Sequence, residues 1–120
     1  MKDIGMGAVE SRFADIIWQN EPLSSAELSQ HAEVVLGWKK TTSYTVLKRL
    51  CDKGIFVNEK GVVRSLISKE EFFSLQSERF VEETFQGSLP AFLAAFTRGK
   101  KLSEKEVLEL RRMIDEFEEK

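Results

Sequence analysis

Residues 38–67 read WKKTTSYTVLKRLCDKGIFVNEKGVVRSLI, and this stretch decides the fold. In its first half, residues 46–50 place apolar side chains on one side of a helix. Thr41 or Thr42 can cap the start of that helix, because a threonine hydroxyl accepts a hydrogen bond from a free backbone N–H. Gly54 supplies the residue that commonly ends a helix. The stretch therefore predicts a helix of about three turns.

The second half of the stretch predicts a β-hairpin. Residues 55–57 and 62–67 are rich in β-branched and aromatic side chains, which favour strands. Residues 58–61, Asn-Glu-Lys-Gly, lie between them and favour a turn. A helix is therefore followed directly by a short antiparallel pair of strands.

Two more helices are expected upstream. The first carries one apolar stripe at helical spacing, formed by Val9, Phe13, Ile16 and Ile17. The second begins at a capping box in which Ser24 and Glu27 each accept a backbone N–H, and it runs to about Leu36 before Gly37. Three short helices followed by a hairpin is the order of a winged helix-turn-helix, which places its third helix in the DNA major groove.

The C-terminal part has a different character. Seven of the nine phenylalanines lie beyond residue 68, and Ser103 with Glu106 forms a second capping box. About 50 residues of helix bury little surface alone, so these apolar stripes need a partner. We expect a homodimer, although the helices could instead fold back on the N-terminal half of the same chain. The expected dimerisation residues are Phe80, Phe85, Leu93, Phe96, Leu110 and Ile114.

The predicted fold class is therefore mainly α with a small β-hairpin. Residues 1–68 are expected to form a winged-helix DNA-binding domain, and residues 69–120 a helical dimerisation domain.

Charge is distributed unevenly along the chain, although its formal net charge is only −2. Residues 38–64 hold seven basic against two acidic side chains, whereas residues 69–120 hold nine against twelve. A local excess of cations beside a predicted third helix favours double-stranded DNA as the partner. The alternatives are a solvated basic face and a winged helix that binds another protein.

The candidate DNA contacts fall into two groups. Hydroxyl side chains in the first turns of the third helix can reach base edges, and cations can bind phosphates. The expected base-reading residues are Thr41, Thr42, Tyr44 and Thr45, and the expected phosphate contacts are Lys39, Lys40, Lys48, Lys60 and Arg64. Arg49 is equivocal, because it can instead pair with a carboxylate such as Glu10.

Other function classes find little support. One cysteine, Cys51, and one histidine, His31, allow neither an internal disulfide nor a metal cluster, and they leave no nucleophile–base pair for an enzyme. No cofactor is expected. The sequence shows neither a signal peptide nor an apolar run long enough for a membrane span, so we expect a cytoplasmic protein without a membrane partner. Trp18 and Trp38 border apolar helix ends, which favours core packing.

Four stretches resemble the penicillinase-repressor family, the BlaI/MecI/CopY-type transcriptional repressors. Residues 10–18 end in Ile-Ile-Trp, and residues 38–54 contain a Trp, a Thr-x-x-Thr, an Arg-Leu and a Lys-Gly stop. Residues 85–88 and 102–110 are similar to the family's dimerisation segment in order and spacing. The resemblance covers nearly the whole chain, and it implies a dimeric repressor that binds a palindromic operator.

The resemblance also implies a route of release from DNA. Antibiotic-response members of the family are cut by a regulatory protease before a phenylalanine that aligns with Phe96, so the corresponding bond here is Ala95–Phe96. Ala95 replaces the family's usual Asn, which leaves open that Phe96 is a core residue and that the signal is a ligand. The paired Cys-x-Cys motifs of the copper-responsive members are absent from this sequence.

Overall fold

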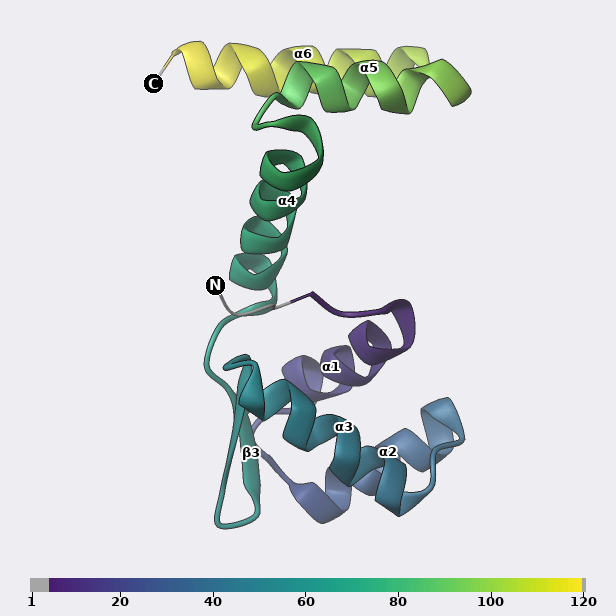
Figure 1. Ribbon diagram of the computed structural model, residues 1–120, viewed down its shortest axis with the longest axis vertical. Coiled ribbons are helices and arrows are strands. Elements are labelled where there is room, and N and C mark those ends of the chain that lie inside the picture. Colours follow the sequence, from purple (N-terminus) through teal and green to yellow (C-terminus); the bar gives the residue numbers. More distant parts are fainter. Residues whose placement is uncertain (1–4, 120) are drawn as a thin grey trace. The chain divides into compact units, whose positions relative to one another are not determined.

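The computed structural model describes residues 5–119 and is mainly helical with a small antiparallel sheet (Figure 1). The elements are, in order, α1 Ala8–Asn20, β1 Leu23–Ser24, α2 Ser25–Leu36, α3 Lys40–Asp52, β2 Phe56–Glu59, β3 Val62–Ser65, α4 Lys69–Phe85, α5 Leu89–Gly99 and α6 Glu104–Glu118. The chain divides into two compact units with the boundary between Ser77 and Glu78. The predicted fold class is confirmed.

Helices α1 and α2 form where their caps and apolar stripes predict them. The Ser24 hydroxyl accepts a hydrogen bond from the Glu27 amide at 3.0 Å, and the Glu27 carboxylate accepts one from the Ser24 amide, which completes the expected capping box. Gly37 ends α2 with a φ of 69°, a left-handed conformation that glycine adopts without a steric penalty. One stripe residue was predicted wrongly, because Val9 is 50% exposed at the first turn of α1.

Helix α3 begins two or three residues earlier than a cap at Thr41 or Thr42 would place it. Its N-cap is Lys39, which makes no side-chain capping hydrogen bond, so the expected cap at Thr41 or Thr42 is wrong. Both threonines instead lie in the first turn of the helix and are exposed. Their hydroxyls are consequently presented on the helix surface rather than used to close its end.

The predicted hairpin is present, and it gains a third strand. Lys60 and Gly61 both have positive φ, 52° and 82°, which is the geometry of a tight two-residue turn that suits the twist of paired strands. Strand β1 pairs with β3 on the other side, so the strand order is β1-β3-β2. A two-residue strand has too few positions to show an alternating pattern, and the sequence reasoning missed it.

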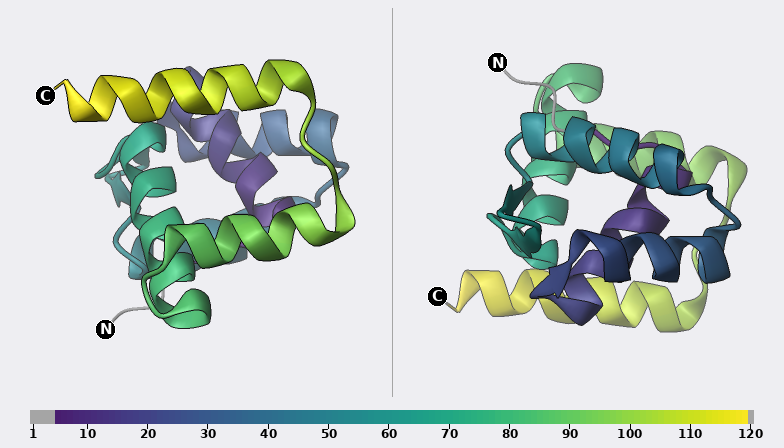
Figure 2. Two further views of the ribbon diagram at one scale, coloured as in Figure 1. Left: turned by 90° about the horizontal axis from the view of Figure 1, so that it is seen from above. Right: turned by 90° about the horizontal axis from the view of Figure 1, so that it is seen from below.

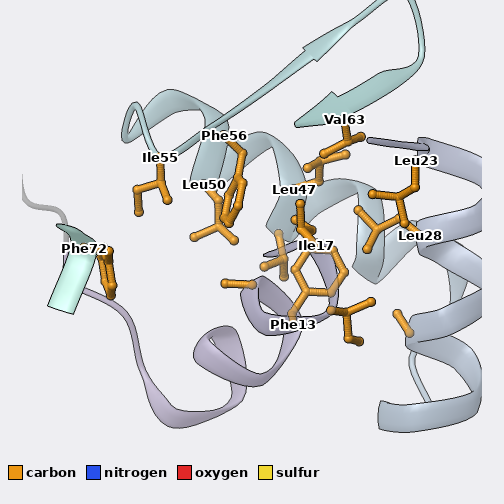
Figure 3. Close-up of a cluster of buried hydrophobic side chains, with 14 residues drawn as sticks. Phe13, Ile17, Leu23, Leu28, Leu47, Leu50, Ile55, Phe56, Val63 and Phe72 are labelled. Atoms are coloured by element: carbon orange, nitrogen blue, oxygen red, sulfur yellow. The ribbon is translucent and has the colours of Figure 1, made fainter. Parts of the chain in front are cut away.

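The core of the first unit gathers side chains from all of these elements (Figure 3). Trp38 stacks on the buried Phe13 with ring centroids 5.0 Å apart. The indole of Trp18 lies 5.7 Å from the ring of Phe72, and its Nε1 donates a hydrogen bond to the Ile67 carbonyl. Both tryptophans therefore have the structural role expected of them.

Phe72 is fully buried and belongs to this core, although it lies in α4. Lys69 also contacts α1, because its Nζ lies 2.6 Å from Asp15 Oδ1. These contacts explain why the first compact unit reaches Ser77. The division of the chain into independently folding domains at residue 68 stays a prediction.

The second unit contains the end of α4 together with α5 and α6. Ser88 caps α5, and Ser103 with Glu106 forms the expected capping box of α6. Hydrogen bonds from the backbone and side chain of Ser103 hold the pKa of the Glu106 carboxyl below its ordinary value. Helices α5 and α6 run in opposite directions, and the views of Figure 2 separate them. No side chain of residues 78–119 is buried.

Ser43 gives a first testable expectation about stability. Its hydroxyl is buried in α3 and has no hydrogen-bond partner among the described residues. Because a buried polar atom without a partner costs free energy, Ser43→Ala should raise the free energy of unfolding by about 1 kcal/mol, measured by urea denaturation. Ser74→Ala, at an exposed position of α4, is the control for helix propensity. A smaller gain for Ser43→Ala than for this control would contradict the expectation.

Candidate nucleic-acid interface

The exposed face of α3 carries the hydroxyl side chains that the sequence singles out. Thr41, Thr42 and Thr45 are all exposed, and positions 41 and 45 are one helical turn apart. The Thr45 hydroxyl donates a hydrogen bond to the Thr41 carbonyl at 2.9 Å. This bond leaves the oxygen lone pairs and the methyl group of Thr45 available to a partner.

Tyr44 lies between this face and α2 and is half-buried. Its hydroxyl donates to Ser25 Oγ at 3.4 Å, and Lys40 Nζ lies 5.8 Å from the centre of its ring. The ring therefore supports the Lys40 ammonium by a cation–π contact, and the hydroxyl is directed at α2. Thr45 is bonded only within α3, whereas Tyr44 contacts a second helix through its hydroxyl.

Cations surround these hydroxyls on α3 and continue onto the hairpin. We use "basic surface" for the five exposed residues Lys39, Lys40, Lys48, Lys60 and Arg64. A groove of about 400 Å³ runs between α3 and β2 and is lined by Lys48 and Tyr44 on one side and by Val57 and Asn58 on the other. The exposed face of α3 and the hairpin are therefore direct neighbours.

The hairpin forms the wing, which we define as residues 56–65. Lys60 occupies its two-residue turn and is exposed. Arg64 points outward from β3, and its Nη2 lies 2.6 Å from Glu59 Oε1. This acidic partner was missed at the sequence level, because it depends on strand register: Glu59 pairs with Val62, so Arg64 sits diagonally across from it.

Two further cations of the basic stretch are engaged within the protein. Arg49 lies 3.8 Å from Glu10, which confirms the alternative that the sequence left open for Arg49. Lys53 Nζ donates to the Gly5 carbonyl at 2.6 Å.

Cys51, near the end of α3, is half-buried, and its burial, together with the charge of Asp52, raises the pKa of its thiol. A protonated thiol is a poor nucleophile and metal ligand.

The expected dimerisation residues all lie in the second unit. Phe80 and Phe85 at the end of α4 each contact Phe92 of α5, with centroids 6.0 Å and 5.6 Å apart. Phe80, Phe96 and Ile114 are exposed, and Phe85, Leu93 and Leu110 are partly buried. The Ala95–Phe96 bond lies inside α5, and both residues are exposed.

Two further questions for the described part of the chain concern metal-binding clusters and membrane-spanning helices. Among residues 5–119, no cluster of three or more His, Cys, Asp and Glu side chains could hold a metal ion. None of the helices described over these residues combines the length and the apolar character that crossing a membrane requires.

The first unit is a winged helix-turn-helix, with α2 and α3 as the helix pair and β2–β3 as the wing. The chain belongs to the penicillinase-repressor family, whose profile matches residues 6–116. This match confirms the family resemblance inferred from residues 10–18, 38–54, 85–88 and 102–110.

Individual relatives agree with this assignment. The chain is 24% identical to the penicillinase repressor of Bacillus licheniformis over 105 residues, which cover 84% of this chain and 82% of the relative. It is 22% identical over 118 residues to the methicillin resistance regulatory protein MecI of Staphylococcus aureus, covering 95% and 96%. The solution structure of the DNA-binding domain of the repressor BlaI matches 59% of this chain and 93% of its own length, with a TM-score of 0.53 and 24% identity. That structural likeness confirms the winged-helix fold.

Proposed function

We propose that this protein is a transcriptional repressor that binds a palindromic DNA operator as a homodimer. The observation that carries the proposal is the exposed face of α3, where three threonine hydroxyls stand among the cations of the basic surface. A helix of this kind fits the major groove, and the wing beside it reaches the flanking phosphates. Membership of a repressor family supports the same conclusion, and an operator as partner implies a cytoplasmic location.

The second unit supports the homodimer. Its helices bury no side chain of residues 78–119, and large apolar side chains on α6, including Ile114 and Phe117, stand exposed. Exposed apolar stripes on a small helical unit are removed from water when a second copy covers them. A two-fold dimer then presents two α3 helices, which suits half-sites spaced by one or two turns of DNA.

Two substitutions on α3 distinguish base recognition from phosphate binding. Lys40→Ala should weaken binding to operator and to random DNA alike, and it should flatten the salt dependence by about one unit per half-site. Thr45→Ala should instead reduce the preference for operator by roughly 1–3 kcal/mol. Fluorescence anisotropy on both DNAs over a range of salt concentrations measures the two effects.

The outcome also decides between the proposal and its main alternative. Equal losses on operator and random DNA for Thr45→Ala would contradict the role given to Thr45. A wild-type chain without salt-dependent DNA binding would favour a winged helix that binds another protein.

For release from the operator, we propose the route that the family resemblance implies. Cleavage at Ala95–Phe96 by a regulatory protease would separate α6 from the DNA-binding unit and abolish bivalent binding. Because the bond lies inside a regular helix, α5 must unwind locally before a protease can accept it in an extended form. Mass spectrometry of the repressor from antibiotic-treated cells tests this route, and an intact chain with derepressed target genes would exclude it.

A further inference from the structure

The wing is attached to the helical body at two points. At its tip, the Gly61 carbonyl accepts a hydrogen bond from the Ser25 amide, the first residue of α2, at 2.8 Å. At its base, the Glu21 carboxylate accepts hydrogen bonds from both donors of Ser65: the amide at 2.8 Å, and the single hydroxyl proton, whose oxygen lies 2.7 and 2.8 Å from the two carboxylate oxygens. Between these points, β1 pairs with β3.

The strand register explains why Glu21 is needed at this place. Leu23 pairs with Val63 and Ser24 with Val62, so the same register would place residue 21 opposite Ser65. However, the pairing of β1 with β3 extends only to Leu23 and does not reach residue 21. Without Glu21, the Ser65 amide would therefore have no backbone carbonyl of β1 to which it could donate a hydrogen bond. The Glu21 carboxylate takes the place of that carbonyl, which satisfies a partly buried N–H.

Fixing Ser65 also fixes its neighbour on the strand. Side chains alternate between the two faces of β3, so Val63 is buried and Arg64 is on the exposed face. The position of the Arg64 backbone, and with it the direction of its side chain, therefore depends on how firmly Val63 and Ser65 are held. The only acid in contact with the Arg64 guanidinium among the described residues is Glu59, and both side chains are more than half exposed. Glu21 therefore contacts the backbone and side chain of Ser65, whereas Glu59 contacts a wing cation.

We propose that Glu21 is a positioning residue that aligns the wing cations Lys60 and Arg64 with the DNA backbone. This inference rests on the proposed DNA-binding function. The expected change in DNA affinity is opposite to the usual one, because removing an acidic charge close to a DNA-binding surface ordinarily strengthens DNA binding. Here the loss of Glu21 weakens DNA binding, since the base of the wing is no longer fixed and only the tip contact and the β1 pairing still hold the wing.

The test compares two acid-to-alanine substitutions in the full-length chain, measured by fluorescence anisotropy on random duplex DNA across a salt series. Glu21→Ala should weaken binding roughly 3- to 10-fold and flatten the salt dependence by about one to two units per DNA-bound protomer, because Lys60 and Arg64 would no longer be held at the phosphates. Glu59→Ala, the matched control on the wing, removes the same charge but frees Arg64, and it should strengthen binding roughly 2- to 5-fold.

A double-mutant cycle shows whether Glu21 acts through the wing. In a chain that already carries Lys60→Ala and Arg64→Ala, Glu21→Ala should cause no further loss of DNA affinity. The proposal would be overturned if Glu21→Ala caused the same loss of DNA affinity in the wild-type chain and in the chain without the two wing cations. Tighter DNA binding by the Glu21→Ala chain would overturn it as well.

Ser65→Ala provides a second variant in case Glu21→Ala does not fold. It removes the hydroxyl donor, keeps the amide donor and changes no charge, so it should weaken DNA binding roughly 2- to 3-fold and speed amide hydrogen exchange in residues 62–65. Unchanged binding and exchange would overturn the proposal. Absence of DNA binding by the wild-type chain would overturn the proposed function as well, and the exchange measurement would still show whether Glu21 holds the wing.

Discussion

A chain truncated after Ser77 is expected to keep its winged-helix fold and to bind operator roughly 10²- to 10⁴-fold more weakly than the full chain. The first unit ends at this residue and contains every side chain that is buried among residues 5–119, including Phe72. What the truncation removes is the exposed apolar surface of the second unit, and with it the proposed link between two half-site readers. Fluorescence anisotropy on a palindromic operator and sedimentation velocity at micromolar protein measure the affinity and the mass.

A fusion supplies the control for this prediction. Joining the truncated chain to an unrelated dimeric coiled coil should restore most of the lost affinity, because it restores a high effective concentration of the second reader. Equal operator affinities of the truncated and full chains would contradict the role given to the second unit. So would a full chain that sediments as a monomer at every concentration.

Phe72→Ala is expected to lower the free energy of unfolding of the first unit by about 3–5 kcal/mol. The side chain is fully buried, and its removal leaves a cavity next to the Trp18 indole. Both tryptophans, Trp18 and Trp38, lie in the first unit, so their fluorescence during urea denaturation reports on this unit alone.

The neighbouring phenylalanine is a matched control. Phe73 lies in the same turn of α4 but is 46% exposed, so Phe73→Ala should cost less than about 1.5 kcal/mol. Similar losses for the two variants would show that residues 69–77 are not held by the core. A wild-type stability for Phe72→Ala would place the boundary of the DNA-binding unit before α4.

The parts of the fold that were predictable from the sequence are those with local chemical signals. Ser24 with Glu27, Gly37 and Ser103 with Glu106 mark helix ends because their hydrogen bonds or φ angles act within a few residues. The spacing of Phe13, Ile16 and Ile17 shows which side of α1 is buried for the same reason.

The features that could not be predicted depend on contacts between distant segments. Strand β1 is defined by its pairing with β3, about 40 residues later in the sequence, rather than by a pattern of its own. The same holds for Glu21, whose partner Ser65 is 44 positions away. At the start of α3 two threonines offered plausible caps, but the helix begins at Lys40, which leaves their hydroxyls on the surface.

The residues of the candidate interface also fall into a group whose exposure was predictable from the sequence and a group whose contacts were not. The cations Lys39, Lys40 and Lys48 are exposed as expected of phosphate contacts, since their place on α3 follows from helical spacing. The ion pair of Arg64 with Glu59 and the engagement of the Tyr44 hydroxyl depend on tertiary geometry. The roles of these residues in DNA binding stay predictions until the substitutions above are measured.

Because no side chain of residues 78–119 is buried within the chain, the response of the target genes is expected to depend steeply on the number of protein copies in the cell. If this unit is stabilised only by its second copy, its folding and the association of two chains are one equilibrium, and the stability of the unit depends on protein concentration. Operator occupancy then varies with the square of the repressor concentration below the dimer dissociation constant. A cell carrying such a gene would switch its target genes over a narrower range of repressor copies than a monomeric regulator allows.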